Sequence, residues 1–233
     1  MDGCHRGWFA VKLGPDAVWS VSCYSSIEEL WQDCRQVRLT LIDIPIGLKD
    51  AGREERLCDL EARKLLGKRA SSVFRPPCRP ALVAGSYSRA LAVNRRYTGT
   101  GISLQAFNIT ARIAEVDRFL SGHPQARGVI RETHPEVCFC MLAGGIPMQY
   151  SKKKAQGRRE RRDILASAWA QADEIVRFSL SAFLRRDVAE DDVLDALAAA
   201  LAAWKAVERD YAVTLPAHPE IDIHGLPMEI VYP

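Results

Sequence analysis

Hydrophobic and polar positions follow spacings that predict an α/β protein. Residues 8–13 and 18–24 are two apolar runs separated by Gly-Pro-Asp, a combination typical of an antiparallel hairpin. Residues 27–34 follow two serines and carry early glutamates, which predicts a short helix with a serine N-cap. The apolar run at 39–48 predicts a buried parallel strand that ends near a proline and a glycine. The chain therefore opens with antiparallel strands and continues into a parallel one.

The remainder of the chain is mostly helical in pattern. Residues 49–128 mix helical segments with Pro-rich loop and are expected to form an insert beside the sheet. A second β signal covers 126–142, and 163–184 has the spacing of one amphipathic helix. Residues 188–207 form an Ala-rich helix that can approach a sheet closely, whereas 211–233 reads as short extended pieces.

Composition narrows the class of protein. With 233 residues, 48% hydrophobic and 26% charged, the chain can bury one substantial core, and we expect a single domain over 1–233. No stretch approaches the roughly 20 apolar residues of a membrane helix, and the N-terminal residues lack a signal-peptide pattern. We therefore expect a cytoplasmic protein without a membrane partner.

The cysteines argue against a disulfide framework. There are seven of them, an odd number that is scattered along the chain, so free thiols are expected. Cys138 and Cys140 form a close pair, but a structural zinc site needs a second such pair, which the sequence lacks.

Isolated acids within apolar segments are the most specific chemical signal. Asp43 interrupts the run 39–48, where an ionised carboxylate is costly unless it is paired or binds a metal. The alternative is that Asp43 caps the following turn. Asp192 and Asp195 share one face of a helix, and a cation between them would relieve their repulsion. Alternatively, Asp192 complements the helix dipole, an explanation that suits Asp195 less well.

Further acids and one histidine are weaker candidates. Asp2 precedes a glycine and the first hairpin, where it is either a ligand or part of a terminal turn. Glu132 and Glu136 lie near the second β signal with His134 between them. A hydrogen-bonded structural imidazole is the simpler interpretation of His134.

Basic residues are concentrated in two parts of the chain. The formal net charge is only +3, but residues 151–162 hold seven Lys or Arg and one Glu, including Lys152, Lys153 and Lys154. The insert carries further arginines, among them Arg75 and Arg79. Both regions either attract phosphates or are solvated surface whose charges pair locally.

Several motifs together resemble known families. The order of an acid at the first hairpin, an acid in the next strand and a late DxxDALA helix resembles RuvC-type members of the RNase H-like superfamily. The motifs MDGC, IDIPIGL, CDLEARKLLG, GTGISLQAF, HPEV and LDALAAA resemble, over nearly the whole chain, the domain-of-unknown-function family four-two-nine. That family is generally described as a predicted nuclease with an RNase H fold, and its function is not established.

The resemblance implies a fold and a metal site. The fold would be an RNase H-like mixed sheet flanked by helices, with the insert at about 49–128. The superfamily's metal-binding acids match Asp2, Asp43, Asp192 and Asp195, with Glu132 as an auxiliary catalytic acid. One or two Mg²⁺ or Mn²⁺ ions would serve as cofactors. Basic side chains, which are Lys152, Lys153, Lys154, Arg75 and Arg79, would hold the substrate's phosphates.

The leading hypothesis is a metal-dependent nuclease or phosphodiesterase acting on nucleic acid or a nucleotide-like substrate. One alternative is a catalytically silent protein of the same fold that binds nucleic acid or nucleotides. Another is a small-molecule phosphatase or phosphotransferase. A fold by itself does not name a reaction, so these alternatives stay open, as does assembly into a homodimer.

Overall fold

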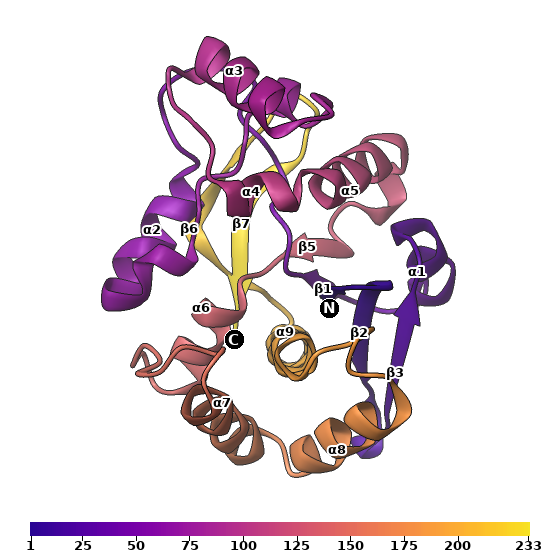
Figure 1. Ribbon diagram of the computed structural model, residues 1–233. Coiled ribbons are helices and arrows are strands. Elements are labelled where there is room, and N and C mark those ends of the chain that lie inside the picture. Colours follow the sequence, from indigo (N-terminus) through magenta and orange to yellow (C-terminus); the bar gives the residue numbers. More distant parts are fainter.

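The computed structural model describes all 233 residues as an α/β protein with nine helices and small mixed sheets (Figure 1). The strands are β1 (Asp2–Cys4), β2 (Gly7–Leu13), β3 (Trp19–Tyr24), β4 (Thr40–Ile42), β5 (Ile130–Glu132), β6 (Val213–Ile221) and β7 (Pro227–Tyr232). The helices are α1 (Ile27–Cys34), α2 (Leu57–Leu66), α3 (Tyr87–Thr98), α4 (Leu104–Asn108), α5 (Thr110–Gly122), α6 (Pro135–Leu142), α7 (Ala155–Ala168), α8 (Ala172–Ala182) and α9 (Glu190–Arg209).

The predicted opening hairpin is confirmed, and it has one strand more than expected. β2 pairs antiparallel with β3, with Val11 opposite Val21, and β1 pairs antiparallel with the other edge of β2. The turn between β1 and β2 requires Gly7, which has a φ of +132°; a Cβ there would lie 2.2 Å from the carbonyl oxygen of Tyr24. This turn directs β1 back beside β2, so Asp2 lies in a strand.

The parallel part of the architecture follows directly beside β1. The amine of Met1 donates to the carbonyl of Leu41 at 2.8 Å, and the amide of Asp43 donates to the carbonyl of Met1 at 3.0 Å. These bonds place β1 alongside β4, which pairs in parallel with β5. A parallel bridge between Thr133 and Val231 connects the end of β5 to β7, and β7 forms an antiparallel hairpin with β6.

The strand predicted at 39–48 is much shorter in the structure, where β4 ends at Ile42. Pro45 has no amide proton for a strand ladder, and the amide of Ile46 donates instead to the Glu132 carboxylate at 2.7 Å. Gly47 has a φ of +73°, and a Cβ there would lie 2.8 Å from the carbonyl oxygen of Pro227. The chain therefore turns away, and Asp43 lies just beyond the strand.

Two other predicted elements are also divided differently. The β signal at 126–142 contains only β5, and its apolar second half forms α6, which begins at Pro135. A short continuous apolar run does not distinguish a strand from a buried helix, and proline suits the first helical position. The single helix predicted at 163–184 is two helices, because the backbone at Trp169 is extended and the side chain of Trp169 packs against Trp204.

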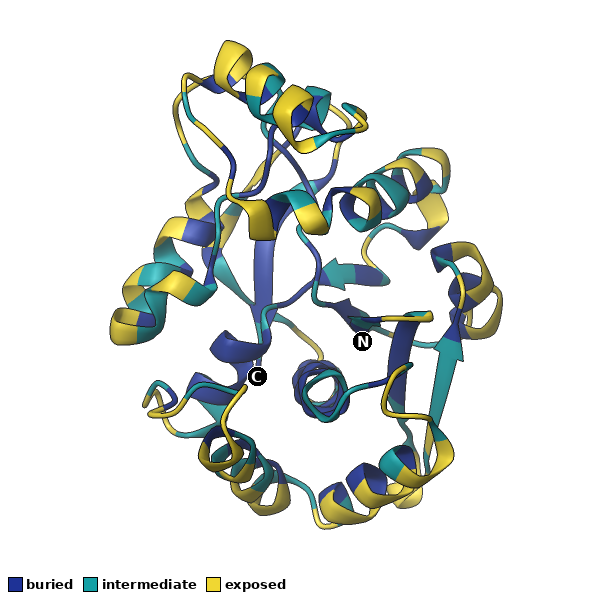
Figure 2. Ribbon diagram, in the orientation of Figure 1, coloured by how far each residue is buried: buried dark blue, intermediate teal, exposed yellow.

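The helices on either side of β1, β2 and β4 build two hydrophobic cores. Side chains alternate between them: Phe9 and Leu41 pack in the core with α9, whereas Trp8 and Ile42 pack in the core with α1 and α5. The predicted alanine face of α9 is buried, and Figure 2 shows this helix as the most deeply buried one. The predicted N-cap of α1 is confirmed, with Ser26 accepting from the amide of Glu29 at 3.2 Å.

The insert from 49 to 128 is partly built into these cores. α5 packs with α1, and α2 packs against the β6–β7 hairpin, whereas α3 lies at the outer edge of the molecule (Figure 1). All seven cysteines are free. None of the helices combines the length and apolar character that crossing a bilayer would require.

Candidate functional site

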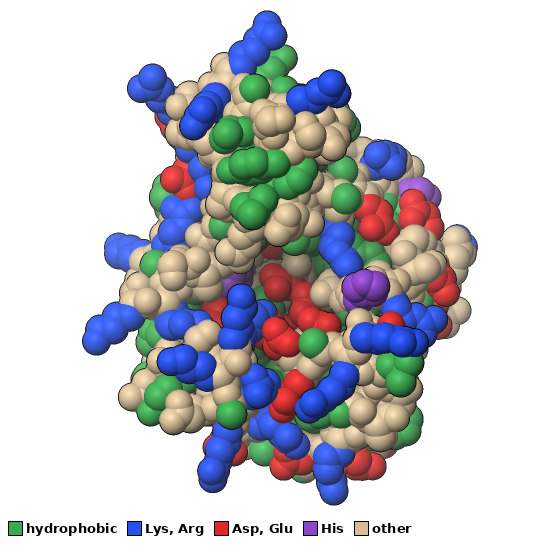
Figure 3. Space-filling model, viewed as in Figure 1, with side chains coloured by type: hydrophobic (Ala, Val, Ile, Leu, Met, Phe, Trp, Pro, Cys, Tyr) green, Lys and Arg blue, Asp and Glu red, His purple; other side chains and the backbone are tan.

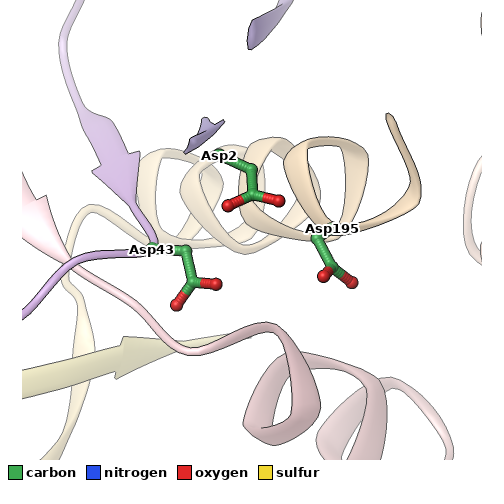
Figure 4. A group of neighbouring side chains, drawn as sticks. All are labelled: Asp2, Asp43 and Asp195. Atoms are coloured by element: carbon green, nitrogen blue, oxygen red, sulfur yellow. The ribbon is translucent and has the colours of Figure 1, made fainter. Parts of the chain in front are cut away.

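Three aspartates from distant parts of the sequence converge at one point. Asp2 lies on β1, Asp43 directly follows β4, and Asp195 lies near the start of α9. One carboxylate oxygen from each lies within 4.8 Å of the other two (Figure 4). We call these three residues the aspartate triad. The sequence predicted all three as site residues, and the packing of α9 across β1 and β4 brings them together.

The triad has few partners inside the protein. Asp2 is 8% exposed and Asp195 only 1% exposed, while Asp43 is partly exposed. The Asp2 carboxylate accepts one hydrogen bond, from the amide of Gly3 at 2.7 Å, and the Asp43 carboxylate accepts none. The nearest cation is Lys152, whose ammonium lies 2.5 Å from Asp195 Oδ2. One ammonium group is thus the only cation in contact with three buried or half-buried carboxylates.

Burial and neighbouring charges raise the pKa of two members of the triad, Asp2 and Asp195. Burial, reinforced by the charges of Asp43 and Asp195, raises the pKa of Asp2 well above the usual range of an aspartate. Burial raises the pKa of Asp195 to about 6, although Lys152 opposes this shift. Burial alone would lower the pKa of Lys152, but Asp195 and Asp2 outweigh it and raise that pKa, so Lys152 stays charged. This single positive charge does not balance the three carboxylates of the triad.

The donor set of the triad suits a hard divalent cation. Mg²⁺ and Mn²⁺ prefer carboxylate oxygens, and two oxygens bound to one Mg²⁺ at about 2.1 Å lie at most about 4.2 Å apart. A spread within 4.8 Å is one small side-chain rotation from that geometry. A bound cation would also supply positive charge, which would offset the repulsion among the buried carboxylates. Asp2, Asp43 and Asp195 are the residues that would hold it.

The fourth predicted ligand, Asp192, lies outside the triad. Its carboxylate accepts a hydrogen bond from the amide of Ala189 at 2.8 Å, which satisfies a free donor at the start of α9. Its charge still contributes to the raised pKa of Asp2, so it lies near the site. The structure thus places Asp192 in the helix-terminal position that the sequence offered as the alternative to a ligand.

The predicted auxiliary acid, Glu132, is held by an arginine. Glu132 is 4% exposed, and Arg56 donates to its two oxygens at 2.7 and 2.8 Å. Arg56 also pairs with Asp59 at 2.6 Å, so this arginine joins α2 to β5. Because the amide of Ile46 donates to Glu132 as well, little capacity is left for a metal. Asp59 lies only three residues from Arg56, whereas the sequence gave no sign of Glu132 as its partner.

The triad lies on the wall of a cleft with a volume of about 820 Å³. Figure 3 shows the acidic side chains in a hollow at the centre of this face, with Lys and Arg side chains around it. Six carboxylates and five Lys or Arg side chains line the cleft. A single divalent cation would change the formal charge of this lining from −1 to +1, so cation binding would prepare the cleft for an anion.

The predicted phosphate-binding residues divide into two groups. Lys152 and Lys153 line the cleft, whereas Lys154 precedes α7 and does not. Arg75 donates to the carbonyls of the loop at Gly52, Arg53 and Glu54. Arg79 is enclosed by acids, which are Asp50, Asp117 and Asp222. Neither arginine lines the cleft with the triad.

Sequence reasoning missed a buried arginine in the basic segment. Arg161 is 0% exposed and contacts the Glu136 carboxylate, and its guanidinium lies over the ring of Phe139 at 5.4 Å. The signal was available: Gly157, Arg161 and Leu165 are spaced by four residues and form one buried face of α7. A Cβ at Gly157 would lie 2.1 Å from the carbonyl oxygen of Ser151, so that face is tightly packed.

Comparison with known proteins places the chain in one family. A family model described as "Protein of unknown function (DUF429)" matches residues 1–221. The chain belongs to this family. No curated protein and no solved structure matches the chain. Within this DUF429 member, the matched range includes the whole aspartate triad and every residue that lines the cleft.

Proposed function

We propose that this protein is a metal-dependent nuclease or phosphodiesterase of RNase H-like fold. The proposal depends on one observation: three carboxylates from separate elements meet within 4.8 Å, buried or half-buried, with only Lys152 to balance them. Such a cluster is costly unless a cation relieves the repulsion. Mg²⁺ and Mn²⁺ are the cations whose ligand preferences it matches.

The arrangement of strands supports the fold assignment. Three antiparallel strands in the order β3, β2, β1 continue into the parallel pair β4 and β5. The two backbone bonds at Met1 connect these sheets. This is the mixed arrangement that the resemblance to RNase H-like proteins implies, with α1 and α5 on one side and α9 on the other.

In this proposal each cleft residue has a role. A divalent ion bound to the aspartate triad would activate a water molecule and stabilise the leaving oxygen of a phosphodiester. Asp2 and Asp195 hold their carboxylates in fixed, buried positions, and the partly exposed Asp43 faces the open cleft. Lys152 balances Asp195 and lies beside the reacting group, and the exposed Lys153 binds a neighbouring phosphate.

The volume of the cleft is compatible with a small substrate. A volume of about 820 Å³ lies within the range of small-molecule sites, which is about 300 to 1,000 Å³. A nucleotide or a short single strand suits it better than a duplex bound along an open groove. The same triad would also support a phosphatase or phosphotransferase, so the experiment must separate bond types.

The test is Mn²⁺-dependent cleavage by the full chain. Labelled single-stranded, duplex and branched nucleic acids are incubated with and without Mn²⁺, and phosphate release from nucleotides is measured in parallel. We expect phosphodiester cleavage that Asp43→Asn and Asp195→Asn each reduce by at least about a hundredfold. Asp191→Asn is the matched control, because it makes the same chemical change on α9 outside the cleft.

The other outcomes identify the alternatives. Binding without cleavage over the whole panel would favour the silent nucleic-acid-binding protein. Release of phosphate from nucleotides without diester cleavage would favour the phosphatase. Activity that survives Asp43→Asn undiminished would contradict the role assigned to the aspartate triad.

A further inference from the structure

Unpaired polar atoms concentrate beside the aspartate triad. Five buried side-chain atoms in the whole chain lack a hydrogen-bond partner within the protein: Arg69 Nε, His134 Nδ1, Glu136 Oε2, Arg161 Nε and Trp169 Nε1. Three of these residues, Arg69, His134 and Glu136, line the cleft. Buried polar atoms are nearly always bonded in native proteins, so a concentration of exceptions at one place calls for an explanation.

The contacts of Glu136 leave one oxygen free. Glu136 is 6% exposed, and its Oε1 accepts from Arg161 and, at 3.5 Å, from Arg69. Its Oε2 has no partner, although it is an anionic acceptor at the start of α6. A buried acceptor left unsatisfied costs about 1–3 kcal/mol, so this oxygen favours a ligand with a proton to donate.

The neighbouring side chains offer one acceptor and one donor. His134 Nε2 lies 3.4 Å from the carbonyl oxygen of Ser72, and because a carbonyl only accepts, Nε2 carries the proton. When Nε2 carries the only ring proton, Nδ1 is a second free acceptor. Arg69 Nε is a free donor. The ligand group must therefore donate a proton and accept one.

A hydroxyl is the simplest group that does both. It can donate to Glu136 Oε2 or His134 Nδ1 while it accepts from Arg69 Nε. A fully ionised phosphate has no proton to donate, and the Glu136 carboxylate would repel it. In a phosphodiester substrate, the hydroxyls belong to the sugar. The 2′-hydroxyl, which both donates and accepts, is the group by which a protein tells ribose from deoxyribose.

We propose that Arg69, His134 and Glu136 form a subsite for a sugar hydroxyl, which makes the protein selective for ribonucleotides over deoxyribonucleotides. This inference rests on the proposed function, because it takes a phosphodiester as the substrate of the same cleft. The position fits, since the subsite and the aspartate triad line one cleft. Lys152, which contacts Asp195, and Lys153 lie in the same lining and are the cationic side chains that would bind the substrate's phosphate.

Binding tests the subsite without turnover. Calorimetric titration with Ca²⁺ in place of Mn²⁺ compares the dinucleotides ApA, dApdA and 2′-O-methyl ApA, together with AMP and dAMP. We expect ApA to bind about ten- to hundredfold more tightly than dApdA, because the deoxy sugar leaves the polar atoms unsatisfied. The methylated probe cannot donate and should bind like the deoxy one. Selectivity for AMP over dAMP would identify a free nucleotide as sufficient.

Two variants assign this preference to the subsite. Glu136→Gln removes the negative charge of the acceptor and with it the ion pair with the buried Arg161, so folding is checked by thermal unfolding. Arg69→Met is the second variant, because that side chain is 24% exposed and its contact with Glu136 is long. Both should lower the ratio of ApA to dApdA affinity towards one. Arg159→Met, at an 86% exposed side chain on α7, is the matched control and should keep the ratio.

The results separate this inference from the proposed function. Equal affinity of the wild type for ApA and dApdA would overturn the subsite, even if both RNA and DNA are cleaved. A preference that Arg69→Met leaves unchanged would overturn it too. Ribose-selective binding without cleavage of any nucleic acid would support the subsite and contradict the nuclease.

Discussion

Two groups of three aspartates converge in this molecule, and each of them contacts a single cationic side chain. The first surrounds the guanidinium of Arg79 and consists of Asp50, Asp117 and Asp222. We call it the Arg79 cluster. The second is the aspartate triad, which consists of Asp2, Asp43 and Asp195. Both join distant segments, so convergence of acids by itself does not distinguish a structural site from a functional one.

The two groups differ in the hydrogen-bond donors around their carboxylates. Burial would raise the pKa of Asp222, but the amides of Leu226 and Leu48 and the guanidinium of Arg79 outweigh it and lower that pKa. In the triad the pKa of Asp2 is raised instead, because burial and repulsion act without a comparable donor set. The Arg79 cluster finds its partners within the protein, whereas the aspartate triad has free acceptor oxygens for a ligand.

We expect the largest loss of stability from the removal of the Arg79 side chain. Arg79→Met leaves three carboxylates without their shared partner, and we expect the free energy of unfolding to fall by about 3–5 kcal/mol. Urea denaturation measures it, with Arg38→Met as control, because that arginine pairs with Asp210 at an exposed site worth less than about 1 kcal/mol. A loss as small as in the control would mean that Arg79 does not hold its cluster together.

A cation should act on the triad alone. Mn²⁺ at a hundred times its dissociation constant should raise the free energy of unfolding by about 2.7 kcal/mol in the wild type. Asp43→Asn should lose most of this increase, because it removes a ligand that has no other hydrogen bond in the protein. Thermal unfolding with and without Mn²⁺ measures both. An equal increase in the variant would place the ion elsewhere.

Metal affinity should depend on pH through Asp195. Its pKa is raised to about 6, and the carboxylate must lose its proton to bind a cation. Below that pH, protons compete with the metal, so the Mn²⁺ dissociation constant should rise by about fivefold from pH 6 to pH 5. Calorimetry at pH 7.5, 6 and 5 tests this. A constant affinity over that range would show that Asp195 is not a ligand.

Without metal, the negative charge on Asp2 should destabilise the folded protein. Its pKa is raised in the folded state, so the folded protein loses stability as the pH rises through that value. Asp2→Asn keeps the acceptor for the Gly3 amide, and in the presence of a chelator it should stabilise the protein at pH 7 by on the order of 1 kcal/mol. The gain should vanish at acid pH, where Asp2 is protonated in both states. A less stable variant at pH 7 would contradict the strain assigned to the triad.

Local sequence patterns correctly predicted the elements that are determined by a few neighbouring residues. The β2–β3 hairpin, the Ser26 cap of α1 and the alanine face of α9 all depend on spacing or neighbouring residues. Patterns that were only apolar were less informative. The run at 126–142 is consistent with both a strand and a buried helix, and its second half is α6.

The sequence by itself determined which carboxylates were unusual, because Asp43 and Asp195 are acids placed in apolar segments, and burying a charge is costly. Only the tertiary structure decided which acids have partners. It brings Asp2, Asp43 and Asp195 together, joins Glu132 to Arg56 and encloses Arg79. The physical reason is that charges interact over a few ångströms in space, and segments far apart in sequence meet only when the sheet and α9 have packed.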